Sequence, residues 1–295
     1  MNAVHELEYT RNSLAISMIK GRTNIILIMV PDFINGFFSS IIQGVENYIR
    51  HEGYVAMVCA IGDEQRIDLA AMVEKYTGMF DGVILIPTEP NFDWIHAIDK
   101  PVVIVDRYIP GSGLTSVTVD NMGGTYRLTK LLLGKNHRDI AIICDDSPMN
   151  IGHGRFNGYM QAMHEYGIEP PREYVHCGGI FEDFGYKSTV QLIHCAKSPT
   201  AIVACGNLLC TGAILAFHDM GIKIGEDISL VGFDENILAS KIKPGVTVVT
   251  GYPVELGRCA AEKLIQRLKE PGLPHEEIVM DMQLIERGSV VRLEG

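Results

Sequence analysis

The chain has 295 residues, 47% of them hydrophobic and 21% charged, which is a typical composition for a globular protein and enough chain for two lobes. Its formal net charge is −11, and so acidic a protein repels phosphate backbones, which excludes a broad nucleic-acid-binding surface. We expect no signal peptide, and the first apolar run, residues 25–30, is too short to span a bilayer. We therefore expect a cytoplasmic protein without a membrane partner.

Short β-branched runs alternate with amphipathic segments from residue 24 onward. The runs are continuously apolar, as expected for strands that are buried on both faces of a parallel sheet. We predict strands at 24–30, 54–60, 82–86, 101–105, 116–119, 139–144, 174–177, 201–204, 228–233 and 247–250. Apolar residues at helical spacing predict helices at 37–52, 64–80, 122–135, 154–166, 181–196, 208–220 and 253–270.

The alternation of strands and helices is typical of βαβ units, and this number of strands exceeds one comfortable sheet. We therefore predict an α/β fold of two doubly wound parallel-sheet lobes that are joined by crossover strands. The expected division is 1–21 for an arm, 22–120 with 250–281 for an N-terminal lobe, and 121–249 with 282–295 for a C-terminal lobe.

Polar and aromatic residues follow the predicted strands, where doubly wound sheets bind their ligands. They are Asp32, Asn35, Phe37 and Phe38 after the first strand, Asp106 and Arg107 after the fourth, Arg155 beyond the sixth, Asn207 after the eighth and Asp234 after the ninth. Carboxylates and amides share hydrogen bonds with hydroxyl groups, arginine offers a planar fork of donors, and phenylalanine stacks on sugar rings. The sequence therefore predicts a cleft for a small polar ligand, such as a sugar.

Each of these residues also has a purely structural interpretation. Asp106 and Arg107 could form a surface ion pair, and Phe38 could be a core residue of the following helix. Arg155 could be a solvated residue at a helix N-terminus, and Asp234 could be a turn or a helix cap. The functional interpretation depends on all of them following strands.

Seven cysteines are scattered along the chain, and none forms a CxxC pair. Most lie in apolar runs, so we interpret them as reduced core residues in a reducing compartment. His176 precedes Cys177 and His194 precedes Cys195, but adjacent residues on a strand or helix point apart. We therefore predict no metal site and no cofactor.

An enzyme on a dinucleotide-binding fold is one alternative. Residues 152–158 read GxGxxxG, but they begin eight residues after the predicted strand that ends at Cys144. Phosphate binding needs such glycines directly at the strand-to-helix turn. No GxSxG, P-loop or HExxH motif is present, and no nucleophile–base pair is visible. We therefore predict that the protein is not an enzyme and has no catalytic residues.

Five short motifs occur in a fixed order along nearly the whole chain. They are VPD with NGFF at 30–38, VDR at 105–107, VDN at 119–121, RFNG at 155–158 and ISLVGFD at 228–234. Together they resemble the LacI-type transcriptional regulators, and residues 9–18 resemble the hinge helix that precedes the ligand-binding core of that family.

The resemblance implies the two-lobed fold of type I periplasmic sugar-binding proteins. It also implies a homodimer formed through this core, and an effector in the cleft that changes how the two hinge helices present their DNA-binding heads. Family members contact the ligand through residues that match Asn35, Phe37, Phe38, Asp106, Arg107, Arg155 and Asp234. Asp32 and Asn207 are further candidates at the same strand ends.

The chain departs from the family pattern at three positions. Gly206-Asn207 stands where the family often has Asn-Asp, Gly251 where it often has Gln, and Gly36 where it often has Pro. The loss of two polar side chains leaves room for a larger or modified sugar, or for Tyr252 to stack on the ligand.

The arm at residues 1–21 resembles a hinge with the remnant of a helix-turn-helix head. The resemblance assigns Asn12, Ala15 and Met18 to the DNA-contacting hinge, with Met18 at the position of the apolar side chain that wedges into the minor groove. Such a head needs roughly 45–50 residues ahead of the hinge. We therefore expect it to be missing here, and operator DNA to be bound only through the missing head and the hinge.

We expect the effector to act by a population shift, because a ligand that touches both lobes favours the closed form. The expected hinges are the crossover segments near 119–122, 247–251 and 281–284. The dimer is expected to use the first helix and neighbouring strands of the N-terminal lobe with part of the C-terminal lobe. A solute receptor of a transport system with the same fold is an alternative, but it would need an export signal.

Overall fold

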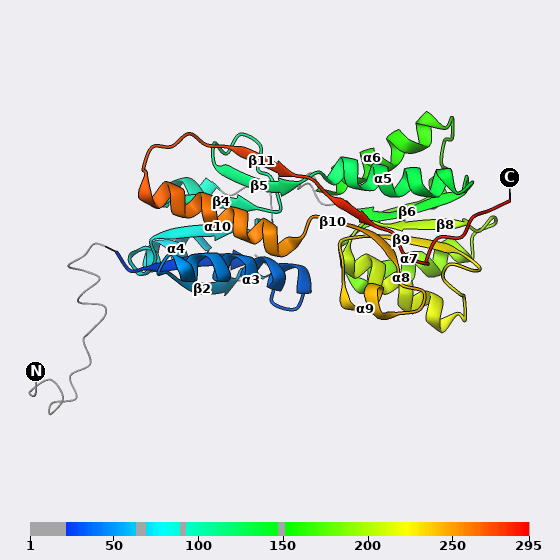
Figure 1. Cartoon of the computed structure of the whole chain (residues 1–295), viewed down its shortest axis with the longest axis horizontal. Coiled ribbons are helices and arrows are strands. Elements are labelled where there is room, and N and C mark those ends of the chain that lie inside the picture. The colour runs from blue at the N-terminus through cyan, green and yellow to red at the C-terminus, as the bar shows by residue number, and fades with distance from the viewer. Residues whose placement is uncertain (1–21, 63–68, 89–92, 147–150, 295) are drawn as a thin grey trace, which may run out of the picture.

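The computed structural model describes residues 22–62, 69–88, 93–146 and 151–294, and it contains two α/β lobes that lie side by side along the long axis (Figure 1). The predicted arm, with its hinge residues Asn12, Ala15 and Met18, lies outside the described residues. In the described part of the chain, no helix combines the length and the apolar character that a bilayer span requires.

The N-terminal lobe is built around a six-stranded sheet. Its strands are β1 (Ile25–Val30), β2 (Val55–Ala60), β3 (Gly82–Leu85), β4 (Val102–Val105), β5 (Thr115–Val119) and β11 (Glu277–Met280). Their spatial order is β11-β5-β4-β3-β1-β2, and every neighbouring pair is parallel.

Helices cover both faces of this sheet, as the continuous apolar strands require. They are α3 (Gly36–His51), α4 (Leu69–Tyr76) and α10 (Pro253–Lys269), with short 3-10 turns at Thr77–Met79 and Asp93–Ala97. Ile26 and Ile28 of β1 pack in the same core as residues of α3 and α10. Leu27 and Met29 project to the opposite face, where they share a core with residues of α4.

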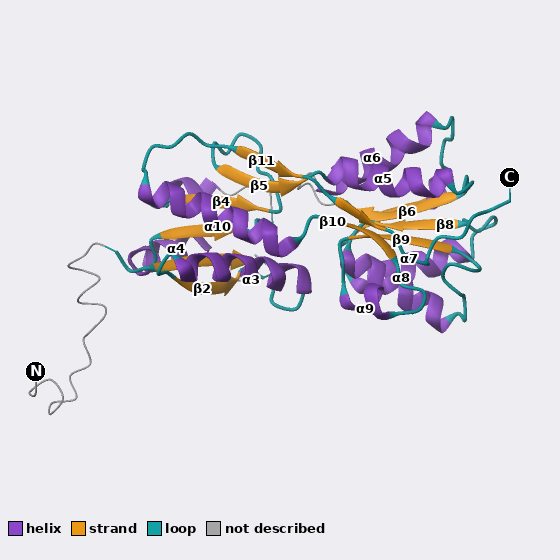
Figure 2. Cartoon of the chain, viewed as in Figure 1, coloured by secondary structure: helices purple, strands orange, loops and turns teal. Residues whose placement is uncertain are grey.

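The C-terminal lobe repeats this plan. Its strands are β6 (Ile140–Asp145), β7 (Val175–Gly178), β8 (Ala201–Ala204), β9 (Ser229–Phe233), β10 (Thr247–Thr250) and β12 (Gln283–Ile285). Their order is β12-β10-β9-β8-β6-β7, which is parallel except for β12 against β10. One face carries α5 (Asn121–Gly134) and α6 (Ile151–Glu165), and the other carries α7 (Glu182–Ile193), α8 (Asn207–Asp219) and the short α9 (Ile237–Lys241) (Figure 2).

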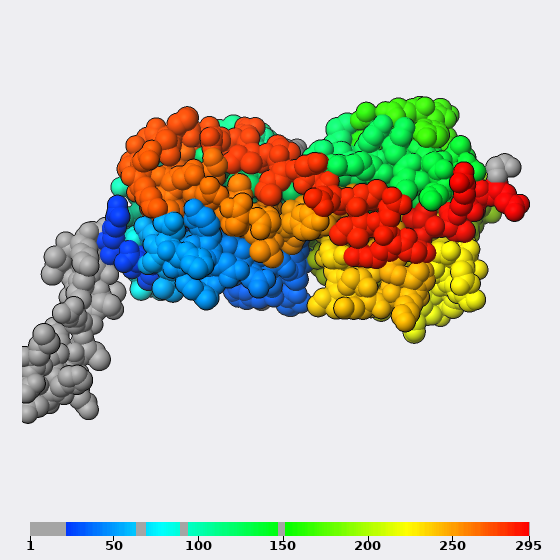
Figure 3. Space-filling view, viewed as in Figure 1, coloured from blue at the N-terminus to red at the C-terminus, as the bar shows by residue number. Residues whose placement is uncertain are grey.

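The chain passes between the sheets three times. The crossings lie between β5 and α5, between β10 and α10, and between β11 and β12. Figure 3 shows the last of these as a band of C-terminal residues that runs over the surface from one lobe to the other. Because α10 returns to pack on α3 while β10 stays in the second sheet, each lobe is built from separate stretches of the chain.

The predicted α/β fold of two doubly wound sheets is confirmed, and each of the ten predicted strands is found within one residue of its expected bounds. The sequence did not predict β11, β12 or α9. The edge strand β11 alternates exposed and half-buried residues, so it carries no continuous apolar run. The predicted helix start at Gly154 is wrong, since α6 begins at Ile151.

Candidate ligand-binding cleft

The residues that follow the strands converge where the carboxyl ends of the two sheets face each other. They enclose a cavity of about 50 Å³. Its lining includes eight of the ten predicted ligand-binding residues: Asn35, Phe37, Phe38, Asp106, Arg107, Arg155, Asn207 and Asp234. The first five come from the N-terminal lobe and the last three from the C-terminal lobe, so the cavity lies between the lobes.

Asp106 and Asp234 occupy equivalent positions in the two lobes. Each follows the fourth strand of its sheet in chain order, and each adopts a positive φ, 71° for Asp106 and 65° for Asp234. The backbone N–H of Asp106 donates to Val117 O at 2.9 Å, and that of Asp234 donates to Val249 O at 2.8 Å. This repeated turn brings one carboxylate to the cavity from each lobe, where each residue is no more than 6% exposed.

Burial raises the pKa of both carboxyl groups, because it disfavours the charged form. The pKa of Asp106 is raised by desolvation, although Arg107 and Arg155 oppose the shift. Desolvation raises the pKa of Asp234 to about 7, with Arg155 opposing and Asp106 adding to the shift. The two carboxyl groups therefore influence each other across the gap between the lobes.

Arg155 is held in place by the C-terminal lobe. Its Nε donates to Asn121 Oδ1 at 2.8 Å, and its Nη1 donates to Cys205 O at 2.9 Å. The guanidinium carbon lies 3.7 Å from the centroid of the Phe233 ring, and Nη2 lies 3.6 Å from Asp234 Oδ2. These contacts fix the guanidinium group of Arg155, which lines the cavity. The side chain is only 8% exposed, so Arg155 is not a solvated residue.

Arg107 is the corresponding guanidinium of the N-terminal lobe. Its Nη1 donates to Pro87 O at 2.8 Å, and its Nε lies 3.7 Å from Asp106 Oδ2, too far for a hydrogen bond. Among the described residues no acceptor satisfies this buried Nε. A surface ion pair is excluded, since the side chains of Arg107 and Asp106 are only 10% and 5% exposed. A ligand oxygen would satisfy the unpaired donor, whose burial otherwise costs about 1–3 kcal/mol.

The lobes touch directly through two asparagines. Asn207 Nδ2, at the start of α8, donates to Asn35 Oδ1 at 2.6 Å. Asn35 is the N-cap of α3, and the same oxygen accepts from Phe37 N at 3.0 Å. Pockets that bind small molecules typically measure about 300–1,000 Å³, so this cavity is smaller than such a pocket and the two lobes lie close together around it.

Phe37 and Phe38 both pack in the core of the N-terminal lobe and line the cavity. Their rings meet edge to face with centroids 5.8 Å apart, and both belong to the buried core under α3. Both also line the cavity. The structural and the functional interpretations of Phe38 are therefore compatible.

Two predicted residues lie outside the cavity. Asp32 Oδ1 accepts hydrogen bonds from the backbone N–H groups of Ile34 and Asn35, so this carboxylate shapes the loop that leads to α3. Tyr252 lies in an adjoining groove of about 690 Å³, where its hydroxyl donates to Gln283 Oε1 at 2.6 Å. Phe37, Asn207 and Leu208 line both spaces, so the groove extends outward from the cavity.

Sequence reasoning missed several residues of the cavity wall. They are Asp145, Ile151, Ile180, Leu208 and Leu209, with Asn121 and Phe233 supporting Arg155. Asp145 is the last residue of β6, and the rule that ligands bind at strand ends identifies it directly. The other lining residues are apolar and carry no signal of their own in the sequence.

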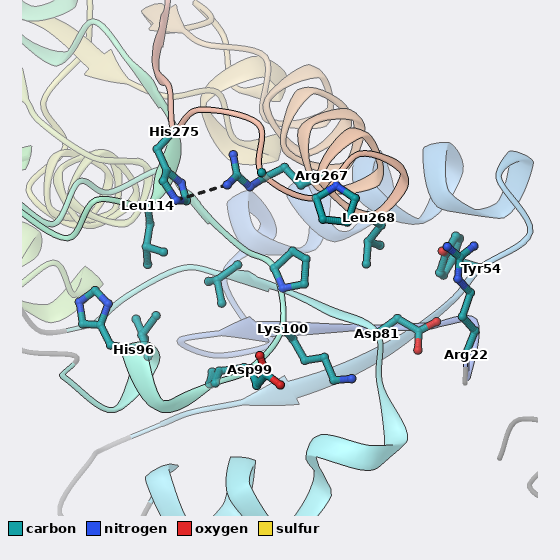
Figure 4. A pocket seen from close by; sticks show the side chains of 16 residues that line it. Arg22, Tyr54, Asp81, His96, Asp99, Lys100, Leu114, Arg267, Leu268 and His275 are labelled. Carbon is teal, nitrogen blue, oxygen red and sulfur yellow. Dashed lines mark hydrogen bonds between the residues drawn. The ribbon is translucent and has the colours of Figure 1, made fainter. Parts of the chain in front are cut away.

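A wider hollow of about 530 Å³ lies at the opposite end of the N-terminal sheet (Figure 4). Its lining includes Asp81, Pro101 and Leu114, which stand just before β3, β4 and β5. Arg267 Nη2 lies 3.3 Å from His275 Nε2, and the Asp81 carboxylate accepts from Thr23. This end carries the amino ends of the strands, whereas doubly wound sheets bind ligands at the carboxyl ends, so the cleft is the stronger candidate.

The glycines of the GxGxxxG run have a packing role. A Cβ on Gly152 would lie 2.0 Å from Asp145 O, and one on Gly158 would lie 2.1 Å from Met122 O. Glycine is therefore required where α6 approaches the end of β6 and the start of α5. In the described ranges, no group of three or more His, Cys, Asp or Glu residues is placed to hold a metal ion.

Comparison with known proteins agrees with this architecture. A family model described as a periplasmic binding protein-like domain matches residues 129–290. The chain is 31% identical to the HTH-type transcriptional regulator RegA of Clostridium saccharobutylicum, over 99% of this chain and 89% of that protein. A LacI family transcriptional regulator from Enterococcus faecium, solved with bound ribose, superposes with a TM-score of 0.82 at 25% identity, over 92% of this chain and all of that one. The chain belongs to the LacI family of transcriptional regulators.

Another solved structure that resembles this chain is the complex of the transcriptional regulator CelR with cellobiose. It has a TM-score of 0.81 at 25% identity and covers 98% of this chain and 88% of that one. These relatives are transcriptional regulators and not enzymes, so the alternative of a dinucleotide-dependent enzyme is wrong. Membership of the LacI family also favours a regulator over a transport receptor.

Proposed function

We propose that this chain is the effector-sensing and dimerisation core of its regulator. It binds a small polar ligand, a sugar or a sugar derivative, between the lobes and transmits lobe closure to a DNA-binding head. The observation that carries this proposal is the convergence of Asp106 and Arg107 from one lobe with Arg155 and Asp234 from the other around a single cavity.

The cavity suits a neutral ligand that is rich in hydroxyl groups. Asp106 and Asp234 offer oxygen atoms that hydrogen-bond to hydroxyl groups, and Arg107 and Arg155 offer donors. Asp145 adds a further carboxylate to the wall. A phosphate or carboxylate ligand would face these acidic groups in a water-poor site, where like charges repel strongly. Ribose and cellobiose, the ligands of two structural neighbours, are both neutral sugars.

The adjoining groove supports a ligand longer than one ring. It shares Phe37 and Asn207 with the cavity, and it presents Tyr252 and Ile237 at its exposed side. An aromatic side chain at such a position stacks on the apolar face of a second ring. Once the lobes move apart and widen the inner cavity beyond its present 50 Å³, it binds one sugar ring, and the groove binds whatever is attached to that ring.

Effector action follows from the placement of the contacts. A ligand that bonds to both Arg107 and Arg155 gains its full interaction energy only when the lobes are closed, so it increases the closed population. The three crossing segments are the points at which the lobes rotate. In a dimer, this rotation changes the distance between the two N-terminal arms and hence the presentation of the DNA-binding heads.

Dimerisation through the N-terminal lobe is supported by apolar residues at its surface. Val55 on the edge strand β2 is 67% exposed, Tyr76 at the end of α4 is 43% exposed, and Met79 in the following 3-10 turn is 40% exposed. Apolar side chains on an unpaired edge strand are typical of a surface that another chain covers. Sedimentation velocity on the whole chain checks this, and a monomer at micromolar concentration would contradict it.

A thermal-shift screen of neutral sugars, sugar phosphates and nucleosides tests the proposed function. A ligand at 100 times its Kd stabilises the folded state by about 2.7 kcal/mol, which raises Tm measurably. We expect a neutral sugar or a sugar-containing compound to raise Tm, and its phosphorylated form to have no effect. A Tm that responds only to phosphorylated or carboxylated compounds would contradict the proposal.

A further inference from the structure

Cys144 and Cys177 face each other across neighbouring strands of the C-terminal sheet. Cys144 in β6 is paired in register with Cys177 in β7, and the two Sγ atoms lie 2.9 Å apart. Both thiols are free. The sequence analysis interprets the cysteines as reduced core residues, and Cys144 is buried as expected. For Cys177 the core interpretation is wrong, because this residue is exposed.

The backbone geometry of this pair suits a disulfide. Registered residues on neighbouring parallel strands project from the same face of the sheet, and such strands lie about 4.7–4.9 Å apart. Disulfides join Cα atoms that are roughly 4.4–6.8 Å apart, with a bond of about 2.05 Å between the sulfur atoms. The sulfurs of Cys144 and Cys177 therefore need to approach by less than about 1 Å, which side-chain rotation supplies.

The two thiols differ in access and in acidity. Cys177 is exposed, whereas Cys144 is buried. The hydrogen bond with Cys144 lowers the pKa of Cys177, although burial and the carboxylates of Asp146 and Asp145 oppose the shift. The same hydrogen bond and burial raise the pKa of Cys144. The thiolate is the reactive form of cysteine, so Cys177 is the thiol that meets an oxidant and Cys144 is the one that resolves the product.

The other five cysteines lack this arrangement. Cys205 and Cys210 are buried, and burial raises the pKa of each thiol to about 12. Cys59, Cys195 and Cys259 are half-buried. Over the ranges that the structure describes, which include every cysteine of the chain, no further pair of cysteine sulfurs lies within hydrogen-bond distance.

We propose that Cys144 and Cys177 form a reversible oxidation site, at which hydrogen peroxide converts the two thiols into a disulfide. The Cys177 sulfur attacks one peroxide oxygen, the O–O bond breaks, and a sulfenic acid forms while the departing hydroxide takes up the thiol proton as water. The Cys144 sulfur then attacks the Cys177 sulfur, and hydroxide leaves with the Cys144 proton as a second water. Two electrons pass from the thiols to peroxide, and a dithiol reductant reverses the change.

The cysteine pair lies next to the wall of the cleft. The proposal that it forms a disulfide does not depend on the proposed function of the cleft. Asp145 directly follows Cys144 and lines the cavity, and it is paired in register with Gly178, which follows Cys177. Asp146 N donates to Gly178 O at 3.0 Å, and Ile180 also lines the cavity. A disulfide at this point ties together the two strand ends that form one wall of the cavity.

Differential thiol labelling of the reduced whole chain tests the proposal. The protein is treated with a small excess of hydrogen peroxide, alkylated, reduced with dithiothreitol and labelled with a second alkylating agent before peptide mass spectrometry. We expect Cys144 and Cys177 to acquire the second label together, with an intact mass lower by about 2 Da before reduction. The fraction of Cys177 that the first alkylating agent modifies should fall at least about ten times faster than that of the half-buried Cys59 and Cys259.

Two serine variants test which cysteine reacts with peroxide first. Cys144→Ser should leave Cys177 as a sulfenic acid that dimedone traps, and Cys177→Ser should leave Cys144 reduced. Cys259→Ser is the matched control, and its Cys144–Cys177 disulfide should form at the wild-type rate. The proposal is overturned if Cys144 and Cys177 keep the first label while other cysteines lose it, or if Cys177 is modified without loss of Cys144. The labelling map of the wild-type chain decides this even if a serine variant does not fold.

Discussion

Asn207 Nδ2 of the C-terminal lobe donates a hydrogen bond of 2.6 Å to Asn35 Oδ1 of the N-terminal lobe. The bond joins the start of α8 to the N-cap of α3, so it connects two helices that belong to different sheets. It lies at the border between the inner cavity and the outer groove, since Asn207 lines both. We therefore expect a change at this contact to affect both the separation of the lobes and the passage between the cavity and the groove.

Breaking this bond should favour the open form. Asn207→Asp removes the donor Nδ2 and places a carboxylate oxygen against Asn35 Oδ1, so two acceptors face each other. Asn35→Asp is the control, because it adds the same charge but still offers an oxygen that accepts from Asn207 Nδ2. Aspartate is also a good N-cap, so α3 keeps its cap. A hydrogen bond contributes about 0.5–1.5 kcal/mol, so Asn207→Asp should raise the open-to-closed ratio by about 2- to 10-fold. Small-angle scattering without ligand should show a larger radius of gyration for Asn207→Asp than for Asn35→Asp, and equal radii would contradict the coupling.

Arg107→Lys should weaken effector binding. Lysine keeps the charge but lacks the planar fork that bonds to Pro87 O through Nη1 and leaves Nε as an unpaired donor among the described residues. We expect affinity to fall by about 10-fold or more, since a hydrogen bond to a charged group contributes about 1.5–3 kcal/mol. Arg138→Lys is the matched control, because Arg138 donates to carbonyl oxygens of Leu133 and His137 away from the cleft. Equal affinities of the two variants in calorimetry would count against a ligand contact at Arg107.

The buried carboxyl of Asp234 should make stability depend on pH. Desolvation raises its pKa to about 7 in the fold, whereas the unfolded chain has the ordinary value of 3.8. The folded state therefore holds a proton that the unfolded state has already lost, so this group stabilises the fold at low pH and loses that effect as pH rises through 7. Between pH 6 and pH 8 the free energy of unfolding should fall by about 1 kcal/mol through this group. Denaturant titrations should show that decrease in the wild type and a smaller one in Asp234→Asn, and parallel pH profiles would contradict the assignment.

Tyr252 should distinguish ligands by length. Its ring lies in the outer groove and outside the inner cavity, so Tyr252→Ala should not change affinity for a single-ring sugar. For a ligand with a second ring, the loss of stacking should lower affinity by about 2- to 10-fold. Tyr252→Phe keeps the ring and removes only the hydroxyl that bonds to Gln283, so it should bind like the wild type. Calorimetry with a monosaccharide and a disaccharide checks this, and an equal loss for both ligands would place Tyr252 in the inner site.

The sequence predicted the strands well because the sheets are buried on both faces. Runs such as residues 25–30 and 201–204 are continuously apolar. This pattern can be recognised in the sequence without knowing how the strands are arranged in the fold. The edge strand β11 was missed because half of its residues face solvent and the pattern weakens. The short helix α9 was missed because five residues carry less than two turns of periodicity.

The sequence predicted the site residues that follow directly after strands. It could not predict contacts that depend on the distance between the two lobes. Asp106 and Asp234 could be placed in one cleft, since the carboxyl ends of parallel strands converge. The bond between Asn35 and Asn207 could not be foreseen, because the distance between the lobes is absent from local patterns. Tyr252 stands next to a crossing segment, so its place in the outer groove depends on the same separation.

Calorimetric titration of Asp234→Ala with the best neutral ligand from the thermal-shift screen tests the central claim most directly. Glu226→Ala is the control, since Glu226 is exposed on the same lobe and pairs only with Lys223 among the described residues. If the effector is bound between the lobes, Asp234→Ala should lose at least about 10-fold in affinity and stay folded and dimeric, while the control keeps the wild-type Kd. Wild-type affinity in a folded Asp234→Ala protein would contradict the assignment of the cleft.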